Sequence, residues 1–474
     1  MHPDGAKTLQ AARENPNFAG SKYERKMKKP FLIVLVFAAS HASAQPEWTV
    51  QQCMQYAVAH NTQVRQAELK LDNYRANRLG AIGNMLPSVE AGVGVQYNFG
   101  RAIDPETNIY TDVSTFYNGY SVQASLPVFD GFNRFHALRA AQASVLMGKN
   151  ALHQQQDQTA LKVLQAFTNV AYYDELVHMA EEKRRETALL LRQTQVMLEV
   201  GRKSPADVAL VESQQAEADY ELTRQQNLKA SALLELKKEM NYPLADSLRL
   251  TTNEISLTSR CRVWRMQSAR ARRDYGSSIV SRNLIPELQQ AYQSVLVSRH
   301  EWLQARTGFY PTLSLSAGLS TSFHKTLHSD ETVPFREQFK NNLGEYVSAT
   351  LRIPIFNRLQ TLTGIRRARN NYRIAQEQFK QKQLELEKLS REAWQDMQAY
   401  QLQMQQMERK VKADSLAYLL TRRQYEEGLS TAIDLHTTSI QLLKSRATLL
   451  QCRLMAVVKE QLVRYYQGET IWTE

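Results

Sequence analysis

The chain repeats one plan twice along its length, and this tandem duplication limits its possible folds more than any other feature. Three pairs of landmarks recur about 225 residues apart, and a fixed offset of this kind marks an internal repeat: Pro87 with Pro311, Pro127 with Pro354, and Gly201 with Gly428. We therefore predict two structural units, 45–255 and 276–467, an Arg-rich connector at 256–275, and a C-terminal tail at 468–474.

Each unit contains two stretches in which apolar residues alternate with small or polar ones. They lie near 88–100, 116–127, 312–324 and 343–354. This period of two predicts β-strands with one apolar face and one face of Ser, Gly and Gln. Phe and Tyr gather near the strand ends, as in the aromatic girdles of membrane barrels. Any single strand also fits a half-buried hairpin of a soluble protein, but four together favour a barrel wall.

Most of the remaining sequence predicts very long helices. In the second unit, apolar residues recur every seven positions, which is typical of a coiled-coil seam: Ile365, Tyr372, Phe379, Leu386, Ala393, Tyr400 and Met407. The segment from about 357 to 427 would be about 100 Å long as a helix, and its counterpart runs from about 133 to 200. Each helix reaches a Gly and then a Ser and an Asp, so we expect a returning helix and tight tips near 201–207 and 428–434.

Four prolines mark the junctions between strands and helices. Pro87 and Pro311 precede predicted strands, and Pro127 and Pro354 lie where a strand is expected to end and a helix to begin. Proline lacks the N–H that a sheet ladder requires, but it is tolerated in the first turn of a helix. The repeated phrase around Pro127 and Pro354 is therefore interpreted as a strand-to-helix junction.

Four strands cannot close on themselves inside a bilayer. Unpaired backbone groups in hydrocarbon cost several kcal/mol each, and the smallest membrane barrels have about eight strands. We therefore expect an α+β chain with long antiparallel coiled-coil helices, whose four strands share a barrel with further copies of the chain. The small and polar strand face predicts an open channel.

The N-terminal region has the pattern of an export signal. Residues 27–44 combine a basic start, an apolar run and a small-residue cleavage site at 42–44. Residues 1–26 are interpreted as an upstream extension, so 1–44 is expected to be absent from the mature chain. No run of 18 apolar residues follows Ala44, so the sequence predicts no transmembrane helix.

Several classes of function lack support in the sequence. Most of the formal charge of +12 comes from residues 1–29 and from six Arg between 260 and 273, so the two units have no basic footprint for nucleic acid. The three cysteines, Cys53, Cys261 and Cys452, form no disulfide framework and have no metal spacing. No catalytic motif is present. We expect no enzyme activity, no cofactor and no metal site.

Taken in order, these features resemble the TolC family of outer-membrane efflux proteins. The resemblance covers about 45–467 and is carried by the duplicated units, the four junction prolines, the phrase PVFDG at 127–131, and the tips around Gly201 and Gly428. It implies a homotrimer in the outer membrane of a Gram-negative bacterium. Three chains of four strands would form one twelve-stranded β-barrel above a periplasmic tunnel of helices.

The resemblance also implies partners for the chain. Such a channel receives small molecules or proteins from an inner-membrane pump, of the RND or ABC type, through a periplasmic adaptor protein. The membrane partner is outer-membrane lipid, and no nucleic acid is involved.

The resemblance assigns roles to the hairpin tips. Gly428, Leu429 and Ser430 match the turn that docks the adaptor, and their counterparts in the first unit are Gly201, Arg202, Lys203 and Ser204. Asp207, Tyr425 and Asp434 match residues of the closing constriction. Some family members carry a further Asp at the position of Thr437, so the charge of this constriction differs here. For Asp207 and Asp434 a plain helix-cap role is an equal alternative.

Two other functions compete with a channel. A non-transport coiled-coil scaffold of the cell envelope would share the heptads, but it has no use for four alternating strands. An enzyme would need a catalytic constellation, which the sequence does not contain.

Overall fold

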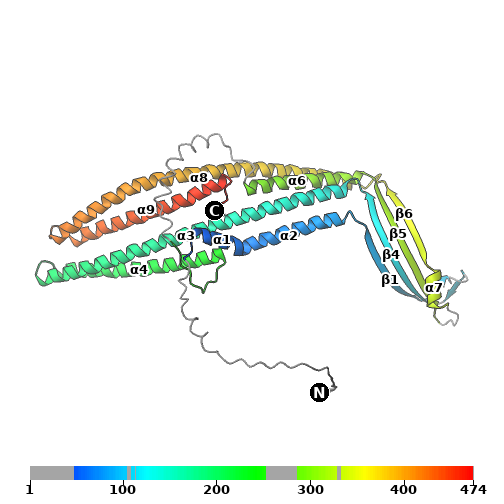
Figure 1. Cartoon of the computed structure of the whole chain (residues 1–474), viewed down its shortest axis with the longest axis horizontal. Coiled ribbons are helices and arrows are strands. Elements are labelled where there is room, and N and C mark those ends of the chain that lie inside the picture. Colours follow the sequence, from blue (N-terminus) through cyan, green and yellow to red (C-terminus); the bar gives the residue numbers. More distant parts are fainter. Residues whose placement is uncertain (1–46, 104–107, 113, 252–284, 328–332, 473–474) are drawn as a thin grey trace, which may run out of the picture. The chain divides into compact units, whose positions relative to one another are not determined.

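Two long helical hairpins and one four-stranded sheet make up most of this computed structural model (Figure 1), which describes residues 47–103, 108–112, 114–251, 285–327 and 333–472. The predicted signal segment, the Arg-rich connector and Cys261 lie outside the described residues.

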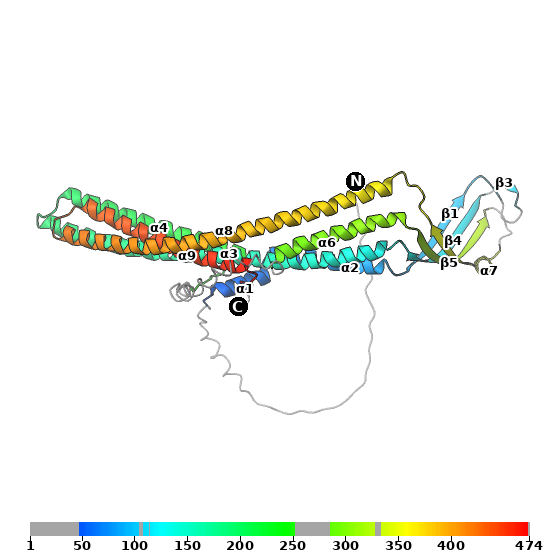
Figure 2. The same cartoon turned by 90° about the horizontal axis from the view of Figure 1, so that it is seen from above.

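The hairpins follow one plan in both halves of the chain. Helix α3 (Asn133–Glu199) returns as α4 (Pro205–Met240), and helix α8 (Gln360–Glu426) returns as α9 (Ala432–Tyr466). Both α3 and α8 have 67 residues, which corresponds to about 100 Å of helix. Each long helix packs against its own returning helix (Figures 1 and 2). The predicted α+β fold with long antiparallel helices is confirmed.

The heptad seam of α8 has two successive partners. None of its seven predicted residues is exposed. Leu386 packs with Leu288 of α6 (Pro286–Arg306), whereas Ala393, two turns further on, packs with Val463 of α9. The apolar stripe of α8 therefore packs against α6 along its first half and against α9 along its second half. This explains why the seam is longer than α9.

Shorter helices complete the helical part. Helices α1 (Val50–His60) and α2 (Thr62–Gly83) both pack on α3. The largest core cluster joins α1, the middle of α3 and the end of α4, and it includes Cys53, Phe167, Leu236 and Met240. A 3-10 turn, Thr307–Phe309, leads from α6 toward the sheet. Within the described residues, no helix has both the length and the apolarity to cross a membrane.

The sheet is antiparallel and draws two strands from each half of the chain. Its order is β1-β4-β5-β6, and a separate small hairpin is formed by β2 and β3. The bounds are β1 (Ser88–Asn98), β2 (Arg101–Ile103), β3 (Tyr110–Asp112), β4 (Thr115–Phe129), β5 (Thr312–Thr326) and β6 (Gly344–Arg352). The two halves meet at the pairing of β4 with β5, so the duplicated chain forms a single sheet.

The strand register gathers apolar residues on one face. Ala91, Val122 and Leu319 lie directly opposite one another on β1, β4 and β5. The next residues along the strands, Gly92, Ser121 and Ser320, form a small polar row on the other face. Space on this polar face is limited near β6, because a Cβ added to Gly318 would lie 2.6 Å from Cε1 of Tyr346. The absence of a side chain at Gly318 thus leaves room for the Tyr346 ring.

The two outer strands of the sheet are unlike each other. Among the described strands, β1 pairs only with β4 and β6 pairs only with β5. Because direction alternates at each step, β1 runs antiparallel to β6. Each chain therefore carries two strand edges with free backbone groups and opposite directions.

A short helix protects part of one strand beyond the end of β6. Helix α7 (Phe335–Asn341) buries Gln338 against β5, where its side-chain amide accepts a hydrogen bond from His324 N at 3.0 Å. The same amide donates to His324 O at 3.0 Å and to Val333 O at 2.9 Å. Gln338 thus takes the place of a paired strand where β6 no longer reaches.

The four junction prolines lie at the ends of strands, with one difference from expectation. Pro87 and Pro311 immediately precede β1 and β5, and Pro354 follows β6. Pro127 was expected to end its strand, but it lies inside β4, which continues to Phe129. The ladder tolerates Pro127 because the register with β5 shifts between Pro127 and Phe129, a bulge at which an N–H is not required.

The repeated phrase adopts the same backbone in both halves. Gly131 and Phe132 have φ values of 67° and 70°, and the matching residues Arg358 and Leu359 have 55° and 63°. Gly131 has no room for a side chain, because a Cβ there would lie 2.6 Å from Cβ of Tyr310. This left-handed turn redirects each strand into its long helix.

Arg134 stabilises the first of these junctions, between β4 and α3, by hydrogen bonding. Its guanidinium donates to Asp130 at 2.8 Å, to Pro127 O at 2.6 Å and to Asn84 O at 3.0 Å. The arginine side chain is only 17% exposed. It therefore joins the end of α2, the end of β4 and the start of α3 through one partly buried group.

Candidate functional site: the hairpin tips and the interface between the hairpins

The first tip is a glycine turn followed by a capped helix. Gly201 has φ 74°, and Arg202 N donates to Met197 O at 2.8 Å, which closes the end of α3. Ser204 is the N-cap of α4, and its hydroxyl accepts from Asp207 N at 3.2 Å. The Asp207 carboxylate in turn accepts from Ser204 N at 3.0 Å, which completes a reciprocal capping box.

The second tip repeats this geometry with the same spacing from its glycine. Gly428 has φ 81°, and Leu429 N donates to Gln424 O at 2.7 Å. The N-cap of α9 is Thr431, whose hydroxyl donates to Asp434 at 2.6 Å, while Ser430 adds a hydrogen bond at 3.3 Å. Leu429 is 76% exposed at the turn. The tip thus presents an apolar side chain on a fixed backbone.

Both tip aspartates are helix caps in the structure. Hydrogen bonds from the Ser204 backbone and side chain hold the pKa of Asp207 below its ordinary value, and those from the Thr431 side chain and backbone do the same for Asp434. The carboxylates also lie at the positive ends of their helices, where negative charge is favoured. The cap role is therefore observed, and a part in the constriction remains a prediction.

Tyr425 joins the two hairpins. Its side chain is 1% exposed and packs with Val211 of α4 and Leu435 of α9. Its hydroxyl lies 3.0 Å from Oγ1 of Thr194 on α3. Lys203, from the first tip, places its ammonium 4.3 Å from the centre of the Tyr425 ring, a distance at which the cation attracts the π face. Within one chain, Tyr425 thus binds its own second hairpin to the first.

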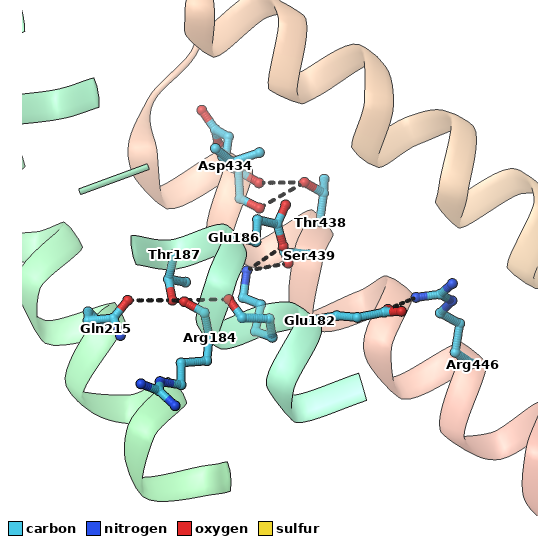
Figure 3. Close-up of polar contacts among 11 residues, drawn as sticks. Glu182, Arg184, Glu186, Thr187, Gln215, Asp434, Thr438, Ser439 and Arg446 are labelled. Atoms are coloured by element: carbon cyan, nitrogen blue, oxygen red, sulfur yellow. Dashed lines mark hydrogen bonds and ion pairs between the residues drawn. The ribbon is translucent and has the colours of Figure 1, made fainter. Parts of the chain in front are cut away.

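Further polar contacts join the hairpins away from the tips (Figure 3). Arg446 of α9 reaches Glu182 of α3 at 3.3 Å. Lys183 donates to Ser439 at 2.6 Å. Arg446 and Glu182 are exposed, so their ion pair contributes only about 0–1 kcal/mol, whereas Ser439 is buried. The interface between the hairpins therefore combines an exposed ion pair with buried hydrogen bonds.

Sequence reasoning identified Tyr425 but missed Thr194, Lys183, Ser439 and Arg446. The members of each pair lie more than 200 positions apart in the chain. A polar residue on a long helix carries no local signal of such a partner.

The described residues contain no cluster of three or more His, Cys, Asp or Glu side chains that could hold a metal ion. Cys53 and Cys452 are free and buried. Burial raises the pKa of the Cys53 thiol to about 12, so this group is a core residue rather than a reactive thiolate.

The sequence matches the family described as outer membrane efflux protein over residues 53–241 and 281–467. The chain belongs to this family. Its two matched segments coincide with the two halves that carry the hairpins. Membership of the family makes the chain an outer-membrane efflux channel protein rather than an enzyme, and the alternative of a coiled-coil scaffold is set aside.

Solved channels show the same fold at low sequence identity. The chain is similar to CusC, with a TM-score of 0.74 and 17% identity over 88% of this chain and 92% of CusC. It is similar to VceC of Vibrio cholerae, with a TM-score of 0.72 and 13% identity over 88% and 96% of the two chains. It is also similar to the open state of MtrE of Neisseria gonorrhoeae, with a TM-score of 0.68 and 15% identity over 89% of each chain. A search of curated proteins gave no match.

Proposed function

We propose that three copies of the chain form an outer-membrane channel that exports small molecules or proteins from the periplasm. The family match supports efflux across the outer membrane. The observation that carries the proposal is the four-stranded sheet, whose one face is apolar and whose two edges have no partner among the described strands.

The strand edges argue for a closed ring of chains. An exposed edge inside lipid is too costly to persist, and β1 of one chain runs in the correct direction to pair with β6 of another. Two chains would supply eight strands and three would supply twelve. The resemblance to TolC-like channels favours three chains and one twelve-stranded barrel.

The two faces of the sheet fit such a barrel. The apolar face would contact outer-membrane lipid, and the row of Gly and Ser would line the lumen. The α3–α4 and α8–α9 hairpins would extend this lumen into the periplasm. Export through the N-terminal signal of residues 27–44 accounts for delivery to this compartment.

The hairpin tips are proposed to receive a periplasmic adaptor and, through it, an inner-membrane pump of the RND or ABC type. The docking residues would be Gly201 to Ser204 on one tip and Gly428 to Ser430 on the other. The fixed glycine turns and the exposed Leu429 support this role, because they present a preformed apolar surface.

The same region is proposed to close the channel at rest, with Asp207, Tyr425 and Asp434 near the constriction. The contact of Tyr425 with Thr194 and the ion pair of Arg446 with Glu182 would hold the hairpins together. An adaptor opens such a gate only if it binds the open arrangement better than the closed one.

Disulfide cross-linking tests the ring directly. In a variant whose native cysteines are replaced by Ala, one Cys is placed at Val93 in β1 and a second is moved along β6 through Val347. We expect at least one position to yield bands of two and three linked chains on a non-reducing gel.

A matched control uses the central strands. Val122 and Leu319 lie opposite each other within one chain, so a Cys pair there should leave the chain monomeric on the same gel. If membrane-inserted protein gives no linked chains from any position on β6, the ring is refuted. Purified protein should also conduct ions across a planar bilayer, and a protein that inserts without conducting would refute the channel.

A further inference from the structure

The two long helices begin next to the sheet with the same pattern of exposed side chains (Figure 1). Each pattern consists of two apolar residues and an arginine, spaced three and four residues apart, which places them on one face of the helix. The residues are Phe132, Phe135 and Arg139 at the start of α3, and Leu359, Leu362 and Arg366 at the matching positions of α8. We refer to these two sets as the basic stripes.

The first part of each long helix carries basic residues without acidic ones. Residues 133–156 of α3 and 360–376 of α8 contain no Asp or Glu. Asp130, which precedes α3, is bound by Arg134 at 2.8 Å. Neither arginine of the basic stripes forms an ion pair with a described residue. The start of α8 adds further exposed arginines, namely Arg367, Arg369 and Arg373.

The other two helices that connect to the sheet add to this positive charge. Helix α2 leads into β1 and exposes Arg78, and α6 leads toward β5 and exposes Arg299 and Arg306. One acidic residue, Glu301, lies between the two arginines of α6. All four helices that join the sheet therefore expose arginine near it.

The arginines of the basic stripes lean toward the sheet. The Cα–Cβ bonds of a helix tilt toward its N-terminus, and both α3 and α8 have their N-terminus next to a strand. Accordingly, the guanidinium carbon of Arg139 lies 5.2 Å from the centre of the Phe135 ring, one turn nearer the sheet. Stacking on a ring uses the face of the guanidinium and leaves the N–H groups in its plane available as donors.

This order of side chains fits the boundary of a membrane. The inference rests on the outer-membrane position proposed above, in which the apolar sheet face lies in hydrocarbon and the helices leave it on the periplasmic side. Phe132 and Leu359 are 62% and 57% exposed, which is unfavourable in a water-filled lumen but fits the edge of the hydrocarbon. The two arginines lie about 9 Å along the helices from their first residues, at the depth of the lipid headgroups.

Phosphate is the group that complements an unpaired arginine at this depth, because the guanidinium fork matches phosphate oxygens. We propose that the basic stripes bind the phosphate groups of anionic phospholipids in the periplasmic leaflet of the outer membrane. The apolar residues of each stripe stop at the hydrocarbon and its arginine stops at the headgroups. The contact therefore fixes the depth of the channel in the bilayer, and with it the distance that the hairpin tips reach into the periplasm.

Electron paramagnetic resonance of spin-labelled lipids tests this contact. The full-length protein is reconstituted into phosphatidylcholine vesicles that contain a trace of spin-labelled phosphatidylglycerol or of spin-labelled phosphatidylcholine. The fraction of each label that the protein immobilises is then measured. We expect a larger immobilised fraction for phosphatidylglycerol. Raising NaCl to about 1 M should remove the difference, because the screening length falls to about 3 Å.

Two matched double variants assign the preference to the basic stripes. Arg139→Gln with Arg366→Gln should weaken phosphatidylglycerol binding about fivefold at each stripe, the value of one arginine near an anionic surface. Arg192→Gln with Arg409→Gln removes the same charge from exposed positions nearer the tips of α3 and α8, so it should leave the preference unchanged. The salt dependence of the wild type requires no variant, so it tests the contact even if the first double variant does not assemble.

Three outcomes would overturn the proposal and leave the channel standing. The first is equal immobilisation of the two lipids by inserted wild-type protein. The second is a shifted reversal potential of the Arg139→Gln, Arg366→Gln channel with an unchanged lipid preference, which would place the arginines in the lumen. The third is loss of the linked ring in this variant, which would assign the stripes to the contact between subunits. A wild-type protein that neither inserts nor conducts would refute the channel, and the lipid contact with it.

Discussion

Removing the hydroxyl of Tyr425 should loosen the contact between the hairpins without disturbing their packing. In Tyr425→Phe, Thr194 keeps its hydrogen bond to Leu190 O at 2.8 Å, so no buried group loses its only partner. The variant therefore loses one neutral hydrogen bond, with a net value of about 0.5–1.5 kcal/mol. Three copies in a ring would lose about 1.5–4.5 kcal/mol, which changes the ratio of closed to open channels by about tenfold to a thousandfold.

The reverse substitution should be more damaging. Thr194→Val leaves the Tyr425 hydroxyl without this partner at a site that is 1% exposed. An unsatisfied buried group costs about 1–3 kcal/mol, so we expect Thr194→Val to open the channel at least as far as Tyr425→Phe does. A channel opening by Thr194→Val at least as large as that by Tyr425→Phe distinguishes the loss of a specific hydrogen bond from a general loss of tip stability.

Conductance of single channels in planar bilayers measures the effect, and entry of a large antibiotic into cells measures it independently. Both should rise in Tyr425→Phe and remain unchanged in Tyr220→Phe, which alters an exposed tyrosine of α4 in the same way. If Tyr425→Phe melts at a lower temperature but conducts like the wild type, the contact stabilises the fold and does not close the channel.

Three further predictions concern the helix caps, the strand-to-helix junction and the buried carboxyl group of Asp157. The double variant Asp207→Asn, Asp434→Asn retains the side-chain oxygens that cap the helices but removes both negative charges. If the aspartates form a charged constriction, the channel should lose cation selectivity in planar bilayers. If they act only as helix caps, the currents should equal those of the wild type. Arg134→Ala should destabilise the strand-to-helix junction by about 1.5–3 kcal/mol, because it removes charge-assisted hydrogen bonds at a partly buried site. The melting temperature of Arg134→Lys should lie between those of the wild type and Arg134→Ala. Equal melting temperatures of all three proteins would contradict this role of Arg134. Burial raises the pKa of Asp157, which accepts from Trp472 Nε1 at 2.9 Å. The contribution of its neutral form is present below the unfolded value near 3.8 and is lost as pH rises through the higher folded value. Asp157→Asn should therefore gain stability relative to the wild type as the pH rises above the unfolded pKa of about 3.8 in thermal melts, and a difference independent of pH would refute the assignment.

Local patterns explain why so much of the fold is readable from the sequence. Alternation along β4 and the seven-residue spacing along α8 are set by the geometry of a single element. The cap roles of Asp207 and Asp434 are equally local, because each hydrogen-bonds within three or four residues of itself. Such features require no knowledge of the partner element.

The features that sequence reasoning missed depend on distant partners or on compensation. Thr194 meets Tyr425 across 231 positions, and only the packing of two hairpins brings them together. Pro127 was placed at the end of its strand because a proline interrupts a ladder, but a bulge in the pairing with β5 removes that penalty. Arg358 adopts the left-handed conformation of Gly131 without having its flexibility, so its residue type gave no signal of the turn.

The two unlike edges of the sheet have a consequence for inheritance. Because all subunits of the proposed ring would cross the membrane in the same direction, β1 of each would pair with β6 of the next, and the subunits would join head to tail. A chain with one damaged edge still docks through its intact edge and prevents the ring from closing. When damaged and normal chains are made in equal amounts, only about one ring in eight consists entirely of normal chains, if three chains assemble at random. Mutations in either edge strand should therefore be dominant, whereas mutations that unfold the whole chain should be recessive.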